Sequence, residues 1–209
     1  MIGMELIPTL EIGWLNGWIL VCLLYLIYGI LLKVFPKDVV ARLYDYDRSG
    51  WSKTQKVIYV IGKLLALVCL VLIIFTPLKI GSNIFIIGTI LYTFGLAGFI
   101  IALFNFKNTP LDQPVARGLY RISRHPQVLM LFISAFGICI AIGSWLVLFI
   151  IIISSLFLRS RDLAEEKDCL ERYGDSYRAY MKRVPRYFLI NTHMKEEENV
   201  KKILEKEGD

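Results

Sequence analysis

Charged residues are scarce in this sequence, and histidines are almost absent. Only 20% of the 209 residues are charged, whereas 56% are hydrophobic and the mean hydropathy is +0.57. This composition excludes a disordered, a collagen-like and an ordinary soluble protein, and it predicts an integral membrane protein. Because the length is near that of a single domain, we expect any activity on the helical bundle and its flanking loops rather than in a separate soluble unit.

Ligands for metals and motifs for soluble cofactors are also missing. With two histidines, His125 and His193, a multi-histidine metal centre is excluded, and we predict no bound metal. The four scattered cysteines compose neither a disulfide framework nor a CxxC-type zinc site. A glycine-rich nucleotide loop, a nucleophile elbow and a P-loop are absent as well. The net charge of +6 is spread over loops between apolar runs, so nucleic-acid binding is not expected either.

Long apolar runs dominate what is present. Residues 14–32, 57–78 and 84–104 are nearly free of charge, and each run is long enough to cross roughly 30 Å of hydrocarbon as a helix. A fourth run, 127–158, is too long for one helix, and the Gly-Ser pair at 143–144 supplies a turn near its middle. The sequence therefore predicts an all-α integral membrane protein with about five transmembrane helices. The last two form a tight helical hairpin, followed by a cytoplasmic C-terminal helical segment.

Lysines and arginines gather on one side of the predicted spans. They are frequent in the loop 33–56, in the segment 105–126 and after residue 158, whereas Lys79 is the basic residue expected on the opposite side. Because short loops rich in these residues remain in the cytoplasm, we expect the N-terminus outside and the functional site and C-terminus inside. Lys63 lies within a predicted span, close enough to its end for the ammonium to reach the cytoplasmic headgroups.

Polar residues that flank the last apolar run are candidates for chemistry. His125 and Pro126 stand where a helix is expected to begin, and the free amides of a first helical turn favour anions. His125 therefore either donates to a carboxylate, ribose or phosphate, or faces lipid headgroups. Arg161 and Glu165 are four residues apart and share one helix face. They form either a solvated ion pair or, because charges near the membrane edge are costly, a site for a charged ligand.

Short motifs occur in a fixed order on both sides of the predicted hairpin. Before it stand Gly118-Leu119-Tyr120 and Arg124-His125-Pro126; after it come Arg161, Glu165-Glu166, Tyr173-Gly174, Tyr177 and Val184-Pro185-Arg186. This order resembles the isoprenylcysteine carboxyl methyltransferase and phospholipid methyltransferase superfamily of integral membrane methyltransferases. The resemblance covers roughly residues 105–190, and it is specific because two separate motifs recur with an apolar hairpin between them.

The resemblance implies methyl transfer from S-adenosylmethionine, bound on the cytoplasmic side between the hairpin and the C-terminal helix. It also implies a lipid-like or isoprenylated acceptor that arrives from the bilayer and carries a carboxylate or an amine. Arg161 matches the arginine that faces the acceptor, and Glu165 joins it as the second catalytic residue. Val128 stands where the family usually has an aromatic residue, so a backbone contact with the cofactor survives but a stacking contact does not. The implied cofactor pocket comprises Gln113, Pro114, Val115, Tyr120, His125, Pro126, Gln127, Val128 and Glu165.

A sulfonium methyl donor is already activated, so the transfer requires an aligned nucleophile and exclusion of water rather than a metal. For a carboxylate acceptor, Arg161 would hold the anion and no base is needed. For an amine acceptor, Glu165 or Glu166 would have to remove a proton. The residues leave both acceptors open.

The implied organisation has three parts. Residues 1–104 hold three N-terminal transmembrane helices, residues 105–190 form the methyltransferase-like region with the hairpin, and residues 191–209 form a polar tail. Two alternative functions stay open. An NADPH-dependent membrane sterol or steroid reductase has a similar C-terminal pattern but usually more spans. A non-catalytic membrane scaffold of the same fold has the departure at Val128 as its only support, and the intact set of Arg161, Glu165 and His125 argues against it.

Overall fold

The computed structural model describes residues 3–45 and 51–187. Within these ranges the chain forms six α-helices and one short 3-10 helix, and it contains no strand. The prediction of an all-α protein is therefore confirmed for this part of the chain. The elements are α1 (Trp18–Val34), α2 (Lys37–Tyr44), α3 (Lys53–Phe75), α4 (Asn83–Lys107), η1 (Gly118–Arg121), α5 (Pro126–Ala141) and α6 (Trp145–Arg183).

Helix starts coincide with residues that cap free backbone amides. Ser52 begins α3 with a capping box, in which its hydroxyl accepts from the Gln55 amide and the Gln55 side chain accepts from the Ser52 amide. Ser82 and Ser144 cap α4 and α6 through their hydroxyls. Pro126 occupies the first turn of α5, where its missing N–H leaves no hydrogen bond unmade.

Two helices, α3 and α4, are long and apolar enough to cross a membrane. They correspond to the predicted runs 57–78 and 84–104. The apolar helices α1 and α5 have 17 and 16 residues, which at 1.5 Å per residue is roughly 25 Å and shorter than a typical hydrocarbon layer. The described residues thus contain two candidate membrane-spanning helices, and five crossings remain a prediction.

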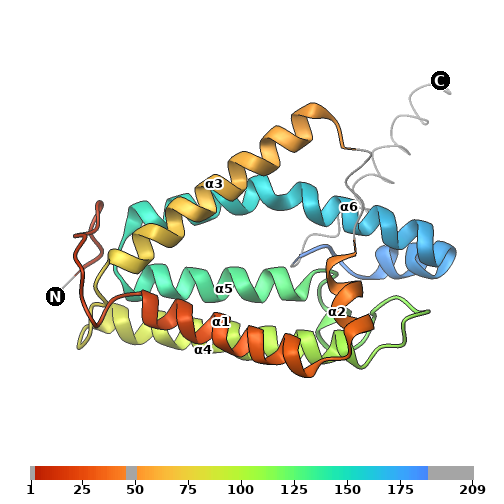
Figure 1. The fold of residues 1–209 in the computed structure, drawn as a ribbon, viewed down its shortest axis with the longest axis horizontal. Helices are drawn as coiled ribbons and strands as arrows, with labels where there is room; N and C mark the ends of the chain where they lie inside the picture. The colour runs from red at the N-terminus through yellow and green to blue at the C-terminus, as the bar shows by residue number, and fades with distance from the viewer. Residues whose placement is uncertain (1–2, 46–50, 188–209) are drawn as a thin grey trace, which may run out of the picture.

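The chain reverses direction between α5 and α6 at the predicted turn. Gly143 has a φ of +70°, a backbone conformation that favours glycine, and Ser144 follows as the cap of α6. Away from the turn the two helices pack on different neighbours: α5 packs mainly along α4, and α6 packs mainly along α3 (Figure 1). The tight hairpin is therefore not confirmed.

Small residues explain the close packing of α5 on α4. A Cβ atom built on Gly137 of α5 would lie 2.4 Å from the amide nitrogen of Tyr92 on α4. A Cβ atom on Gly95 of α4 would lie 2.5 Å from the amide nitrogen of Ser134 on α5. The two backbones can approach this closely only because both positions lack side chains.

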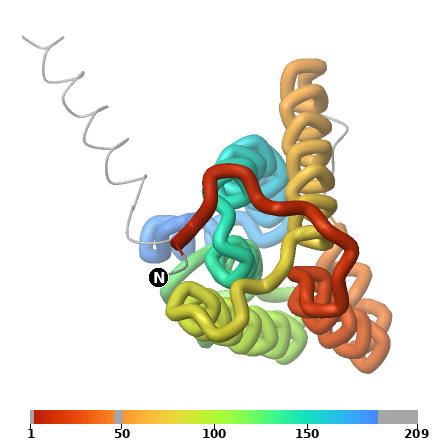
Figure 2. The backbone as a smooth tube through the Cα atoms, turned by 90° about the vertical axis from the view of Figure 1, so that its left-hand side faces the viewer, coloured from red at the N-terminus to blue at the C-terminus, as the bar shows by residue number. Residues whose placement is uncertain are grey.

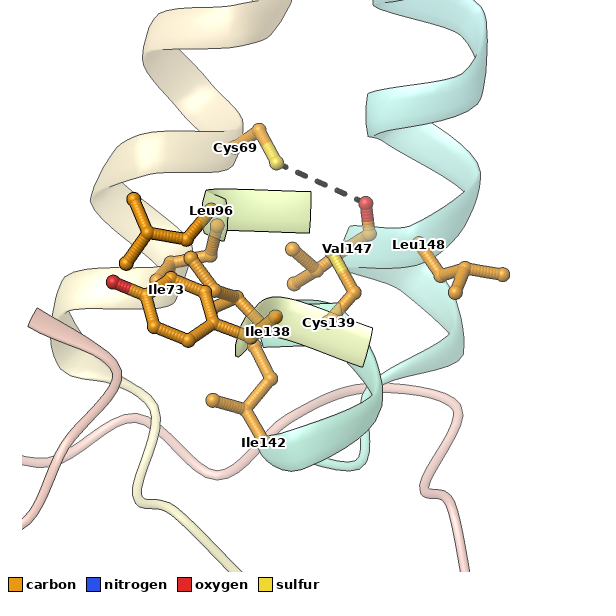
Figure 3. Packing of buried hydrophobic residues seen from close by; sticks show 9 residues of the cluster. Cys69, Ile73, Leu96, Ile138, Cys139, Ile142, Val147 and Leu148 are labelled. Atoms are coloured by element: carbon orange, nitrogen blue, oxygen red, sulfur yellow. Dashed lines mark hydrogen bonds between the residues drawn. The ribbon is translucent and has the colours of Figure 1, made fainter. Parts of the chain in front are cut away.

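The buried apolar core joins α3, α4, α5 and α6. Cys69 and Ile73 of α3 meet Leu96 of α4, and the end of α5 and the start of α6 close the cluster (Figure 3). The Cys69 thiol lies 3.8 Å from the carbonyl oxygen of Val147, at the start of α6. Further along the same helices, the Ser154 hydroxyl donates to the Gly62 carbonyl at 3.0 Å. These contacts fix α6 on α3.

The segment before α1 crosses one end of the bundle. The Glu5 amide donates to the Gly143 carbonyl at 2.7 Å, and the Leu78 amide donates to the Leu15 carbonyl at 2.9 Å. Figure 2, viewed onto this end, shows the segment passing across the helix ends. An ion pair of 2.6 Å between Glu5 and Lys79 adds to these contacts. The motifs that carry the candidate catalytic and binding residues lie at the other end of the bundle.

A bend in α6 shapes that other end. Gly174 has a φ of +55° and a ψ of −127°, values that glycine adopts far more readily than other residues. After the bend the chain returns toward η1, where the Tyr180 hydroxyl donates to the Tyr120 carbonyl at 2.7 Å. The Arg124 amide then donates to the Pro185 carbonyl at 2.9 Å. Motifs that are sixty residues apart in sequence are joined in this way.

Candidate functional site

A small cavity of about 50 Å³ opens where the end of α4 meets α2, η1 and α6. Figure 1 shows α2 and the later part of α6 at this same end of the molecule. The cavity combines three kinds of side chain: carboxylates, guanidinium groups and aromatic rings. They are Asp45, Glu165 and Asp168; Arg42, Arg124 and Arg172; and Phe106, Tyr120, Tyr173, Tyr177 and Tyr180, with Val115 and Cys169 completing the wall.

Three residues of the implied cofactor pocket line this cavity, namely Val115, Tyr120 and Glu165. Gln127 is one step behind them, because its side-chain amide donates to the Tyr120 hydroxyl at 2.8 Å. The Gln113 carbonyl accepts from Arg42 at 2.6 Å, so this residue takes part through its backbone. The other pocket residues, Pro114, His125, Pro126 and Val128, do not line the cavity, and neither does Arg161, which the resemblance assigns to the acceptor.

His125 is buried behind the cavity, between two neighbouring carboxylates. Its Nε2 atom lies 3.1 Å from Oε1 of Glu166, and its Nδ1 atom lies 3.8 Å from Oε2 of Glu165. Burial alone would lower the pKa of His125, but the hydrogen bond to Glu166 and the charges of Glu165 and Asp162 raise it above the ordinary value of 6.5. The histidine thus connects the cavity wall to a buried ion network.

Glu166 is the centre of that network, and 3% of the residue is exposed. Arg186 donates to both of its carboxylate oxygens, at 2.9 and 2.7 Å, and Nη1 of Arg124 lies 3.1 Å from Oε1. Burial alone would raise the pKa of Glu166, but the hydrogen bonds from His125 and Arg186 lower it to about 2. Glu166 therefore stays ionised and serves as a structural anchor.

Glu165 has a different environment, although it is the adjacent residue. Its side chain is 37% exposed and faces the cavity. Loss of surrounding water raises the pKa of Glu165, while His125 and Arg161 oppose that rise. The same loss of water, together with the charge of Glu165, raises the pKa of Tyr120 well above 10, so this phenol stays protonated. Burial also raises the pKa of Cys169 to about 12, which leaves its thiol neutral and a poor nucleophile.

No pattern in the sequence indicated the contribution of α2. Arg42 donates to the carbonyls of Pro110 and Gln113 at 3.0 and 2.6 Å, and its guanidinium lies over the rings of Phe106 and Tyr173. Asp45 and Arg172 of α6, which both line the cavity, form an ion pair. The helix α2 is short and carries no recognisable motif. Its role therefore emerges from the structure alone.

A second group of possible ligands lies beside the cavity. His125, Asp162 and Glu165 each bring one ligand atom to within 4.8 Å of the others, a spacing that a metal ion can bridge. Asp162 is buried and accepts a hydrogen bond of 2.6 Å from the Tyr187 hydroxyl. Both His125 and Asp162 are thus already held by protein partners. The absence of a bound metal remains a prediction.

We expect His125 to stabilise the fold most at acidic pH. Because its pKa in the folded protein lies above 6.5, its stabilisation is complete below pH 6.5 and is lost as the pH rises through the folded value. The measurement is the thermal unfolding midpoint of detergent-purified wild type and His125→Gln between about pH 5 and 9. The gap between the two proteins should narrow as the pH rises. A gap that is constant or widens would contradict this assignment.

A family model described as phospholipid methyltransferase matches residues 71–176. The chain belongs to the phospholipid methyltransferase family. This family is part of the group of membrane methyltransferases that the motifs resemble, so the predicted family is confirmed. No curated protein matches the chain.

Membership in the phospholipid methyltransferase family indicates methyl-transfer activity at a membrane. The matched region begins inside α3 and ends just after the bend at Gly174. It contains η1, α5 and the two glutamates of the site, but it leaves out α2. Arg42 and Asp45 thus complete the cavity from outside the matched region. The predicted tail at 191–209 lies outside the residues that the structure describes.

Proposed function

We propose that the protein transfers a methyl group from S-adenosylmethionine to a lipid-like acceptor at the membrane interface. The observation that carries this proposal is the cavity, in which Glu165 and Asp168 stand among aromatic rings and guanidinium groups. The cofactor, when bound, supplies a methyl group attached to a positively charged sulfur. The side chains of the protein must align the nucleophile and exclude water.

The residues of the cavity fit the chemical groups of that cofactor. Aromatic rings such as those in the cavity wall suit both a stacked adenine and a nearby positive charge. The carboxylates Glu165 and Asp168 suit the sulfonium and the ammonium, whereas guanidinium groups suit the carboxylate of the amino-acid part. A cavity with one kind of group alone would not match such a ligand.

Protein groups would then position the reactants and exclude water. Arg42 fixes the loop that contains Gln113, Pro114 and Val115, which we assign to the cofactor pocket together with Tyr120. Arg161 lies one helical turn before Glu165, and we assign it to the acceptor. With a carboxylate acceptor Arg161 holds the anion. With an amine acceptor Glu165, whose pKa is raised, is the group suited to take up the proton.

The position of the cavity supports an acceptor that stays in lipid. It opens at the end of α4, one of the two candidate spans, so a nucleophile at the membrane surface can reach it while an apolar tail remains between helices. Basic residues gather at this end, and Lys79 lies at the other. We therefore propose that this end is cytoplasmic, that the N-terminus is outside, and that α1, α5 and the first part of α6 also lie in the membrane.

Calorimetry on detergent-purified protein tests the cofactor directly. S-adenosylmethionine or its demethylated product, S-adenosylhomocysteine, should bind saturably, and NADPH should not. Binding of NADPH without binding of either methyl-donor ligand would reject the proposal in favour of the reductase. Binding of none of the three would favour the scaffold.

Two substitutions should separate cofactor binding from turnover. Glu165→Ala removes a carboxylate from the cavity wall and should weaken binding of S-adenosylhomocysteine at least about tenfold. Arg161→Ala should leave that affinity largely intact and lower the rate of methyl transfer, because Arg161 is assigned to the acceptor. Lys167→Ala is the control, since Lys167 is 70% exposed. Equal loss of cofactor affinity in the first two variants would contradict the assignment.

A further inference from the structure

Arg124 is a buried cation whose hydrogen-bonding capacity is unused. Its side chain is 1% exposed, and it lines the cavity. None of its three guanidinium nitrogens has a hydrogen-bond partner within the part of the chain that the structure describes. Buried guanidinium groups normally use their donors, because an unpaired donor away from water is costly. This arrangement points to a partner outside the described residues, and a ligand that enters the cavity is such a partner.

The nearest carboxylate cannot serve as that partner. Nη1 of Arg124 lies 3.1 Å from Oε1 of Glu166, which forms an ion pair without a hydrogen bond. Oε1 of Glu166 already accepts hydrogen bonds from His125 and Arg186, and Oε2 accepts one from a second nitrogen of Arg186. Both lone pairs of Oε1, the oxygen nearest to Arg124, are thus taken by other donors. The charge of Glu166 attracts Arg124, but the guanidinium N–H groups of Arg124 make no hydrogen bond with it.

Hydrogen bonds hold the backbone at Arg124 in place. Its amide donates to the Pro185 carbonyl at 2.9 Å, and the hydroxyl of the preceding Ser123 donates to the Arg186 carbonyl at 3.0 Å. These bonds fix the backbone of Arg124 at the junction between η1 and the end of α6. The other two arginines of the cavity differ, because Arg42 donates to backbone carbonyls and Arg172 pairs with Asp45.

We propose that Arg124 is the receptor for an oxyanion that enters the cavity. A planar guanidinium with free donors matches a carboxylate or a phosphate through two parallel hydrogen bonds. Two sources carry this chemistry: the carboxylate of the methyl donor and the phosphate of a lipid acceptor. The choice between them rests on the proposed function, whereas the oxyanion site rests on Arg124 itself.

Two ligands that differ by one carboxylate test the first source. S-adenosylhomocysteine carries the carboxylate, and S-adenosyl-3-thiopropylamine lacks it. Wild type should prefer the former at least about tenfold, and Arg124→Met should abolish this preference while retaining its affinity for the amine. Retained affinity shows that the variant is folded. Arg124→Lys, which keeps the charge but not the planar fork, should show an intermediate preference, and Arg178→Met on the exposed surface should behave as wild type.

Inorganic phosphate tests the second source. If the anion is the phosphate of an acceptor, inorganic phosphate should bind to protein already saturated with S-adenosylhomocysteine. Arg124→Met should then lose phosphate binding but keep the preference for S-adenosylhomocysteine over S-adenosyl-3-thiopropylamine. Unchanged preference and unchanged phosphate binding in Arg124→Met and Arg124→Lys would overturn the proposal. If wild type binds neither nucleoside, the proposed function fails, and Arg124-dependent phosphate binding then decides the oxyanion site alone.

Discussion

Replacing Glu166 with alanine is expected to destabilise the folded protein by about 3–5 kcal/mol, because the change leaves buried positive charge without its partner. Arg186 loses two hydrogen bonds, Arg124 loses its ion pair and His125 loses an acceptor. The measurement is thermal unfolding of the detergent-purified variant, read as a fall in the unfolding midpoint and in the yield of monodisperse protein.

The matched control for this prediction is Glu171→Ala. Glu171 is on the same helix, pairs with Lys167 at 3.6 Å and is 68% exposed, so its removal should cost less than about 1 kcal/mol. Similar unfolding temperatures of the two variants would contradict a structural role for the buried network. Glu165→Ala serves as a second comparison, because Glu165 is partly exposed and its loss should affect ligand binding more than stability.

Gly137→Ala is expected to destabilise the protein by about 3 kcal/mol or more, even though it adds one methyl group. The new Cβ would meet the backbone nitrogen of Tyr92 at 2.4 Å and the carbonyl of Gly88 at 2.7 Å, and backbone atoms cannot move aside as a side-chain end can. Separation of α5 from α4 would also displace the start of α5, which borders the site. Unfolding midpoints and yield of folded protein measure the effect.

Gly29→Ala provides a control with the opposite sign. A Cβ on Gly29 has no atom within 4 Å, and the residue lies in the middle of α1 with an exposed surface. Alanine favours the helix by up to about 1 kcal/mol over glycine, so this variant should be neutral or slightly more stable. Tolerance of alanine at Gly137 would show that the helices are not packed as closely as described.

Local patterns in the sequence predicted much of the fold. Apolar runs located α3 and α4, and the Gly-Ser pair at 143–144 located the turn before α6. The partners of α5 and α6 could not be read in the same way. A hydrophobic run indicates that a helix lies in lipid or in the core. Which helix it packs against depends on small residues such as Gly95 and Gly137, and their matching positions become visible only once the two helices are packed together.

Site residues that lie in sequence motifs could be predicted. Site residues that only the tertiary structure brings together could not. Tyr120 and Glu165 lie in motifs, and both line the cavity. The bidentate pair of Glu166 and Arg186 depends on the bend at Gly174, because a straight helix would carry Arg186 away from Glu166. Arg42 comes from a short helix without a motif, so its contacts with the loop before η1 had no sequence signal.

The most direct test of the central claim is transfer of label from radioactive S-adenosylmethionine to total membrane lipids of the source organism, followed by organic extraction and mass analysis. The proposed function predicts label in an extractable lipid, and the fragment mass then names the nucleophile as a carboxylate or an amine. The same reaction with Glu165→Ala should yield little label. Label confined to water-soluble products or soluble protein would contradict a lipid-like acceptor, and no label in any fraction would contradict methyl transfer by this chain.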